Sequence, residues 1–263
     1  MNVQKPLIKY GWLRAIIYAL AIFAISLFVK QYAILVGCVI LITFLCRNFL
    51  DGQSFISLGL NIKGYSNEAM LGIFIPIAML GAGTLMLTGL GYLKFIEVTF
   101  STDIIKELSF LIAVAFVEEI IFRGYLLNNL MQSTNKWIAL FITAALFAAV
   151  HMGNPGANIL PGINVFAAGV LLGVNYIYTK NLWFSISFHF AWNTFQGPVL
   201  GYDVSGLKMT TLIEQSIDGP TLITGGTFGF EGSIICLALI IFNVLMLALV
   251  FYNRYNQQSN KHS

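Results

Sequence analysis

Apolar runs recur along the whole chain and are separated by short stretches that hold charges, glycines or prolines. An α-helix needs about 20 apolar residues to cross a bilayer, and several of the runs approach that length. Hydropathy and the breaks between runs predict eight membrane spans. They are roughly Trp12–Val29, Tyr32–Cys46, Ala69–Leu93, Ile105–Leu130, Trp137–Met152, Ile163–Tyr178, Leu182–Leu200 and Gly232–Tyr252.

The pattern therefore predicts an all-α, polytopic integral membrane protein. We expect a single integral membrane domain over residues 1–263, with a disordered polar tail at about residues 253–263. The first apolar run lacks a clear small-x-small cleavage site, so we expect a retained helix instead of a signal peptide.

Composition supports this assignment and excludes other classes. Hydrophobic residues make up 58% of the chain and charged residues 10%, whereas soluble domains carry about 25% charged residues. The net charge of +3 is small and dispersed, so no nucleic-acid partner is expected. The cysteines are odd in number and lack a metal-type spacing, which argues against a disulfide framework.

The distribution of basic residues predicts the orientation in the membrane. With the N-terminus in the cytoplasm, four Lys residues fall on the outer side, at positions 30, 94, 106 and 208. The cytoplasmic segments then hold nine Lys and Arg residues: Lys5, Lys9, Arg14, Arg47, Lys63, Lys136, Lys180, Arg254 and Lys261. This bias places both termini in the cytoplasm of a multi-pass protein of the cell membrane.

Three predicted spans carry ionisable or amide side chains deep in the bilayer, where a charge costs at least ~2.5–3.5 kcal/mol. They are Glu118, Glu119 and Arg123 in the fourth span, His151 in the fifth, and His189 and Asn193 in the seventh. We expect no buried charge in the other spans. Such a concentration of costly groups indicates a functional site.

Helical spacing sorts these side chains. Glu119 and Arg123 are four residues apart, so they share a face and are expected to form a supporting ion pair. Glu118 points about 100° away and needs other partners. His189 and Asn193 are also four residues apart and can face one point.

Depth brings the groups together. At about 1.5 Å of rise per residue, Glu118, His151 and His189 fall within roughly 10 Å of one level, near the middle of the membrane. A carboxylate and an imidazole can hold a water for attack on a carbonyl. The second imidazole and the carboxamide of Asn193 can stabilise the resulting oxyanion. We expect aromatic side chains to shape the cavity: Phe147, Trp192 and Phe195.

Other interpretations remain open on these residues alone. A helix-packing contact is one, although five ionisable groups are many for that purpose. Zinc held by Glu118, His151 and His189 is another, although no H-E-x-x-H helix is present. A proton-coupled transporter is a third, although no internal repeat is visible.

Three motifs resemble those of a known family. Glu118–Arg123 fits E-E-x-x-x-R, Phe147–His151 fits F-x-x-x-H, and His189–Asn193 fits H-x-x-x-N/D. In this order and on separate spans they resemble the CAAX-protease and bacteriocin-processing family, over a protease core at about residues 105–200. A glycine-rich segment at residues 225–232 is similar to one in bacterial members, and a simple turn explains it equally well.

The resemblance implies an eight-helix intramembrane endopeptidase. It implies Glu118 as catalytic base, His151 as its water-binding partner, and His189 with Asn193 as the oxyanion hole, supported by Glu119 and Arg123. No cofactor is expected, although the family was first described as metalloproteases. The implied partner is a membrane-associated peptide or protein, of CAAX, bacteriocin or other type. The alternative is a non-catalytic immunity or scaffold protein.

Overall fold

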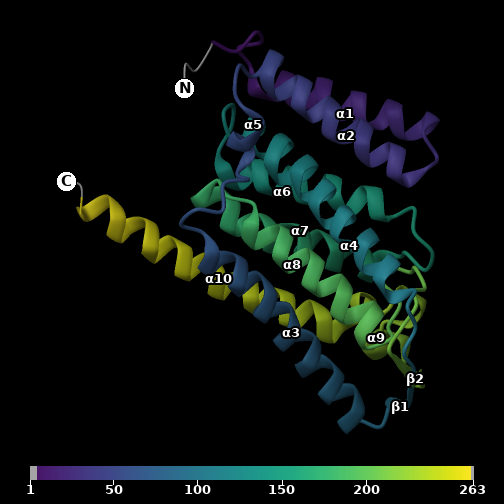
Figure 1. Cartoon of the computed structure of the whole chain (residues 1–263). Helices are drawn as coiled ribbons and strands as arrows, with labels where there is room; N and C mark the ends of the chain where they lie inside the picture. Colours follow the sequence, from purple (N-terminus) through teal and green to yellow (C-terminus); the bar gives the residue numbers. More distant parts are fainter. Residues whose placement is uncertain (1–4, 262–263) are drawn as a thin grey trace.

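The computed structural model describes residues 5–261, and the side chains of residues 5–254. Long helices run side by side through most of the molecule (Figure 1). They are α1 Gly11–Phe28, α2 Tyr32–Leu45, α3 Ser66–Gly89, α4 Ile104–Glu119, α6 Lys136–His151, α7 Ile159–Thr179, α8 Trp183–Thr194 and α10 Ile234–Lys261. Each predicted span overlaps one of these helices.

By length and composition, five helical segments of the described chain can cross a membrane. They are Gly11–Phe28, Tyr32–Leu50, Ser66–Gly89, Ile159–Thr179 and Ile234–Arg254. A shorter apolar helix is α6. The two other long helices, α4 and α8, carry polar groups of the candidate site. The fold is therefore the predicted one, a helical polytopic membrane protein.

Short helical segments extend several of these helices. The helix α4 continues without a break through a π-helical segment, Ile120–Leu127, into α5, Asn128–Leu130. Similar π-helical segments follow α2 and α8, at Cys46–Leu50 and Phe195–Val199. A 3-10 turn lies at Phe55–Leu58. Because π-helical turns are rare and concentrate at functional sites, the segment directly after Glu119 agrees with a site at this point of the chain.

A small antiparallel sheet, absent from the sequence-based prediction, joins β1, Leu93–Val98, to β2, Ile213–Ile217. The predicted third span extends to Leu93, whereas α3 ends at Gly89. The chain turns at Gly91, whose φ of +77° suits glycine, and the apolar residues of β1 raise the hydropathy beyond the turn.

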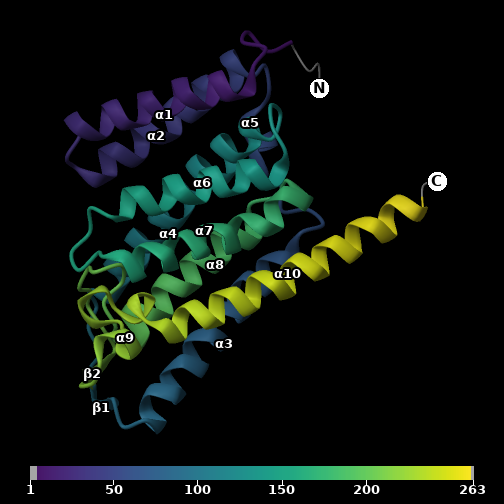
Figure 2. The ribbon, with the colours of Figure 1, turned by 180° about the vertical axis from the view of Figure 1, so that it is seen from behind.

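The sheet lies at the end of the bundle opposite the start of α1 and the end of α10 (Figures 1 and 2). Three short segments lie between β2 and α10: α9, Thr221–Thr224, and the 3-10 turns Gly226–Phe228 and Phe230–Gly232. Residues of this end, from the loop at 204–209 and from the segment before α10, line the cavity of the candidate site.

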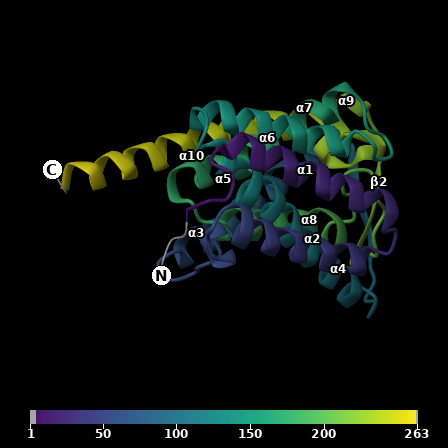
Figure 3. The same ribbon diagram turned by 90° about the horizontal axis from the view of Figure 1, so that it is seen from above.

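The predicted disorder of the polar tail is wrong as far as Lys261, because α10 continues to that residue. Its last turns extend beyond the ends of the other helices (Figure 3). Extending an existing helix adds a hydrogen bond for each residue without a new nucleation step. His262 and Ser263 lie outside the described residues.

Glycines allow the central helices to approach closely. The helix α8 packs along α3, and α7 packs along α6 and α10. A Cβ atom at Gly72 of α3 would collide with the backbone oxygen of Phe184 in α8. A Cβ atom at Gly169 of α7 would lie 2.9 Å from Cα of Ala144 in α6. Small residues at such crossings are typical of membrane helices, and here they fix α7 and α8.

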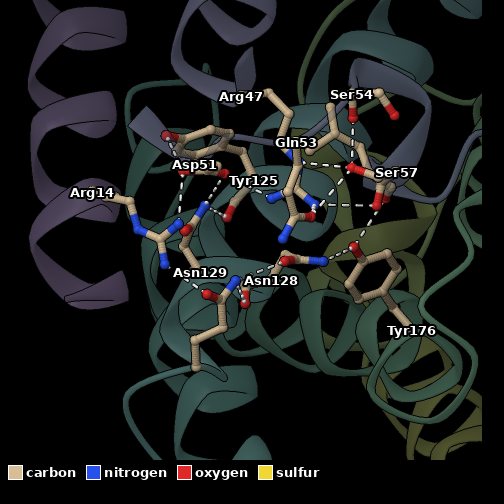
Figure 4. A network of polar contacts seen from close by, with 12 residues as sticks. Arg14, Arg47, Asp51, Gln53, Ser54, Ser57, Tyr125, Asn128, Asn129 and Tyr176 are labelled. Carbon is tan, nitrogen blue, oxygen red and sulfur yellow. Dashed lines mark hydrogen bonds and ion pairs between the residues drawn. The ribbon is translucent and has the colours of Figure 1, made fainter. Parts of the chain in front are cut away.

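A buried polar network centred on Asp51 anchors the other end of the bundle (Figure 4). Nη1 of Arg14 lies 3.1 Å from Oδ1 of Asp51, and Nη1 of Arg47 lies 2.7 Å from Oδ2. Tyr125 and Asn129 also donate to this carboxylate, each at 3.2 Å. All three charged side chains are buried. The expectation of no buried charge in the other spans is therefore wrong for Arg14, which lies in the first predicted span, because ion pairing lowers the cost of burial.

The network ties the fourth helix to the amino-terminal hairpin of α1 and α2. Tyr125 belongs to the π-helical segment that follows Glu119, and Asn129 belongs to α5. Asn128 donates to the hydroxyl of Tyr176 in α7, which in turn donates to the carbonyl of Leu58. The carboxyl-terminal continuation of the helix that carries Glu118 is thus held on two sides.

Candidate active site

The four residues predicted to form the site line one cavity of about 360 Å³. Glu118 comes from α4, His151 from the end of α6, and His189 and Asn193 from α8. Helix α7 and the loop at residues 204–209 supply further walls, which are mostly apolar. Three helices far apart in sequence therefore bring these side chains together.

Glu118 faces both imidazoles. Its Oε2 atom lies 3.9 Å from Nε2 of His151 and 3.9 Å from Nε2 of His189. These distances are too long for direct hydrogen bonds. Oε2 is buried and has no hydrogen-bond partner among the described residues. The carboxylate is therefore placed for a small polar molecule between itself and the imidazoles.

His151 has a defined orientation. Its Nδ1 atom lies 2.8 Å from the backbone oxygen of Phe147, one helical turn earlier. Because a carbonyl oxygen only accepts, Nδ1 carries the proton of the neutral ring. The Nε2 atom, which faces Glu118, is then a hydrogen-bond acceptor.

His189 is oriented by the second glutamate. Its Nδ1 atom lies 3.0 Å from Oε1 of Glu119, so an ionised Glu119 accepts a hydrogen bond from this ring. The Nε2 atom points toward Glu118 and the cavity. His189 is 8% exposed and Glu119 is fully buried, which keeps water from competing for their bond.

The predicted ion pair between Glu119 and Arg123 is present and wholly buried. Nη1 of Arg123 donates to Oε1 of Glu119 at 2.7 Å. Nη2 donates to the backbone oxygen of Gly169 in α7 at 3.0 Å. The same carboxylate oxygen therefore serves Arg123 and His189, and the arginine links α4 to α7.

Phe147 contacts both the buried arginine and the histidine of its own helix. The guanidinium of Arg123 lies 4.6 Å from the centre of its ring, a cation–π distance. The ring of His151 packs 4.5 Å away, and that of Phe122 meets it edge to face. With its carbonyl holding His151, this residue gives the F-x-x-x-H spacing a physical basis.

Of the other residues predicted to lie at the site, two line the cavity and one does not. Asn193 lines the cavity one turn beyond His189 and is 6% exposed. Trp192 also lines the cavity, as expected. Phe195 does not line it; it begins the π-helical segment after α8 and packs on the hydrophobic core instead. The helix changes its winding there, which defeats an extrapolation from regular α-helical spacing.

Several polar residues of the cavity wall are missing from the sequence-based prediction, among them Glu231 and Asn164. Glu231, in the glycine-rich segment, lines the cavity and accepts a hydrogen bond from Trp192. Asn164 of α7 lines it as well. A carboxylate near the end of a span is ordinary by hydropathy, so only the unusual glycine content of residues 225–232 offers a signal.

The donor arrangement differs from that of a metal site. Among the residues that the structure describes, no group of three or more His, Cys, Asp or Glu is arranged to hold a metal ion. The 3.9 Å separations around Glu118 exceed the roughly 3.4 Å between donor atoms around a tetrahedral zinc ion. We therefore assign no step of the chemistry to a metal.

A known family model matches the segment of the chain that contains the candidate site. Residues 100–195 match the model of the type II CAAX prenyl endopeptidase Rce1-like family. The matched segment contains the whole of α4, α6 and α8, and with them all four predicted residues. No curated protein matches the chain. Over residues 100–195 of its 263 residues, the chain is similar to the CAAX-protease family, and this match supports the resemblance seen in the three motifs.

Proposed function

We propose that this protein is a glutamate-dependent intramembrane endopeptidase that acts on a membrane-associated peptide or protein. The observation that carries the proposal is the position of Glu118 Oε2, 3.9 Å from the Nε2 atoms of two histidines. The family match supports a CAAX-type endopeptidase. The hydrogen-bonding roles of the side chains then define the steps of the reaction.

A water molecule fits between Glu118 and His151. Hydrogen bonds of about 2.8 Å to two atoms 3.9 Å apart enclose an angle of roughly 90° at the water oxygen. Oε2 of Glu118 and Nε2 of His151 are both acceptors, so the water donates to both. Its lone pairs are then free to attack a peptide carbonyl in the cavity.

Glu118 acts first as general base and then as general acid. As the water oxygen bonds to the carbonyl carbon, one water proton passes to Glu118. The tetrahedral intermediate collapses when its C–N bond breaks and Glu118 returns that proton to the leaving nitrogen. The second water proton stays on the new carboxyl group, so the immediate products are a carboxylic acid and an amine, and no redox partner is needed.

His189 and Asn193 form the oxyanion hole of this proposal. The Asn193 amide is a donor, and the Nε2 atom of a doubly protonated His189 is another. Glu119 accepts from Nδ1 of His189 and thereby orients the ring and balances its charge. Donors fixed in a low-dielectric cavity stabilise developing charge better than water does.

A proteomic comparison tests the function even though the natural substrate is unidentified. Membranes of cells that produce the wild type are compared with those that produce Glu118→Gln. We expect at least one uncleaved precursor to accumulate with the variant. Identical membrane peptides in the two samples would overturn the proposal, and solute flux driven by a pH gradient in proteoliposomes would favour a transporter instead.

A kinetic test uses a defined peptide. The purified protein in liposomes receives an internally quenched, farnesylated peptide ending in Cys-aliphatic-aliphatic-X, here called the probe peptide. The match to prenyl endopeptidases motivates this choice. We expect cleavage by the wild type and a loss of about 10²–10⁴-fold in kcat for Glu118→Gln, the usual contribution of a general base. Equal rates would remove Glu118 from the base role.

A further inference from the structure

The carboxylate of Glu231 joins two parts of the cavity wall, the helix α8 and the loop at residues 204–209. Its Oε1 atom accepts a hydrogen bond from Nε1 of Trp192 at 2.7 Å. Its Oε2 atom accepts from the backbone N–H of Ser205 at 2.8 Å and from the Ser205 hydroxyl at 2.7 Å. Charge-assisted bonds of this length are the stronger class of protein hydrogen bonds.

One partner belongs to the helix of the oxyanion hole. Trp192 lies in α8 between His189 and Asn193, is 7% exposed, and lines the cavity. Its ring stacks on that of Phe188, with centres 6.0 Å apart. A bond to the indole N–H therefore fixes the side chain that separates the two proposed oxyanion donors.

The other partner belongs to the loop at residues 204–209, which lines the cavity. Ser205 has a left-handed backbone conformation, with φ of +48°, which is uncommon for a residue other than glycine. Apolar side chains of the same loop line the cavity: Val204, Leu207 and Met209. The Glu231 carboxylate is thus the point at which this loop is tied to the rest of the site.

Glu231 is itself held firmly. The Nδ2 atom of Asn164 donates to the backbone oxygens of Glu231, at 2.6 Å, and Ser233, at 2.8 Å. Asn164 is 1% exposed. The preceding Gly225 has φ of +91° and a Cβ there would collide with the backbone of Gly229, so the turn that presents Glu231 requires glycine. The glycine-rich segment therefore fixes the position of the Glu231 carboxylate.

We propose that Glu231 is a positioning residue of the active site, which locks the loop at residues 204–209 onto the helix that carries His189 and Asn193. It touches no reacting atom; it acts through Trp192 and Ser205. The inference rests on the proposed endopeptidase function. It extends the site beyond residues 100–195, the segment that matches the family model.

The test compares Glu231→Gln with the wild type on the probe peptide. Glutamine retains the size of the side chain but cannot accept from Trp192 and the Ser205 N–H at once without turning a donor toward one of them. We expect kcat/KM to fall about 10- to 100-fold, the loss typical of a bond to a charged group. Glu214→Gln, an exposed carboxylate of β2 outside the cavity, is the matched control and should leave kcat/KM unchanged.

A double-mutant cycle distinguishes positioning from general destabilisation. Trp192→Phe removes the indole N–H and keeps an apolar wall. If Glu231 acts through Trp192, the double variant Glu231→Gln with Trp192→Phe should be less impaired than the product of the two single effects predicts. Independent, multiplicative losses would overturn the proposal, as would a Glu231→Gln variant with wild-type kcat and KM.

Amide hydrogen exchange supplies a readout that does not depend on catalysis. The Ser205 N–H donates directly to Glu231, so its exchange should accelerate in Glu231→Gln while exchange in β1 and β2 stays unchanged. Faster exchange throughout the chain would indicate that Glu231→Gln unfolds the protein. In that case the milder variant Ser205→Ala, which removes only the hydroxyl, replaces it and should still raise KM several-fold.

The two proposals fail in different ways. If the wild type cleaves no peptide, the proposed function fails. If the wild type cleaves the peptide but Ser205 exchange is unchanged in Glu231→Gln, only the positioning role of Glu231 fails.

Discussion

Oε1 of Glu119 accepts from Nη1 of Arg123 at 2.7 Å and lies 3.0 Å from Nδ1 of His189. One buried carboxylate oxygen thus serves a cation on its own helix and an imidazole on α8. Adjacent glutamates consequently have different tasks. Glu118 faces the cavity, and Glu119 orients the His189 ring, whose Nε2 atom faces Glu118.

Removing the charge of Glu119 should therefore impair catalysis as well as folding. In Glu119→Gln, the amide oxygen can still accept both bonds, but it carries no full negative charge and therefore holds Arg123 and His189 less firmly. We expect kcat on the probe peptide to fall at least tenfold because His189 loses its orientation. Steady-state kinetics of the folded fraction, isolated by gel filtration, would measure this. A folded variant with wild-type kcat would show that Glu119 supports the helix alone.

Loss of either oxyanion donor should slow the chemical step more than it weakens binding. For His189→Ala and Asn193→Ala we expect kcat to fall roughly 10²–10³-fold with KM changed much less. Single-turnover cleavage of the probe peptide separates the two effects. Unchanged rates in both variants would remove these residues from the site.

The buried arginine of the fourth helix should be needed for stability. Arg123→Ala leaves Glu119 buried without its cation, and breaking such a pair on one side costs about 3–5 kcal/mol in soluble proteins. We expect a lower yield of folded protein and a lower melting temperature in detergent. The matched control is Lys106→Ala, which breaks the exposed pair with Asp103 and should leave both quantities near wild type.

The polar network at the other end makes a similar prediction for Asp51. Asp51→Asn leaves the buried guanidinium groups of Arg14 and Arg47 without an anion, so we again expect a destabilisation of about 3–5 kcal/mol. Thermal unfolding followed by circular dichroism measures it. Asp103→Asn, which removes an exposed carboxylate, is the control. A melting temperature equal for the two variants would contradict the anchoring role of Asp51.

Metal removal should not abolish activity. No step of the proposed mechanism passes through a metal, so treatment with a chelator followed by gel filtration should leave cleavage of the probe peptide intact. Elemental analysis of the same sample should find zinc far below one ion per chain. Activity that disappears with the chelator and returns with zinc would favour a metalloprotease with Glu118, His151 and His189 as ligands.

The sequence predicts the helical bundle and the central residues of the site, because charged residues are rare within apolar spans and are therefore easy to recognise. Helical spacing pairs Glu119 with Arg123, and depth brings Glu118 to the level of the histidines. Spacing within one helix cannot reveal how neighbouring helices rotate, so the bond between Glu119 and His189 emerges only in three dimensions.

The sequence-based prediction misses features at the ends of spans for a different reason. Charges are expected there, so neither Asp51 nor Glu231 differs by hydropathy from an ordinary loop carboxylate. The two strands are more than a hundred residues apart in the chain, and hydropathy does not distinguish a half-exposed strand from the end of a helix. Long-range pairing decides these parts of the fold.

The network around Asp51 also bears on how the chain assembles. Arg14 is made first, yet Asp51 comes later, and Gln132, which accepts from Arg14 at 2.6 Å, comes later still. Until the helix ending at Leu130 has entered the bilayer, the pair of Arg14 and Asp51 lacks Tyr125, Asn129 and Gln132, the later residues that complete its hydrogen bonds. The amino-terminal hairpin therefore completes its docking only after a helix that is synthesised later has arrived.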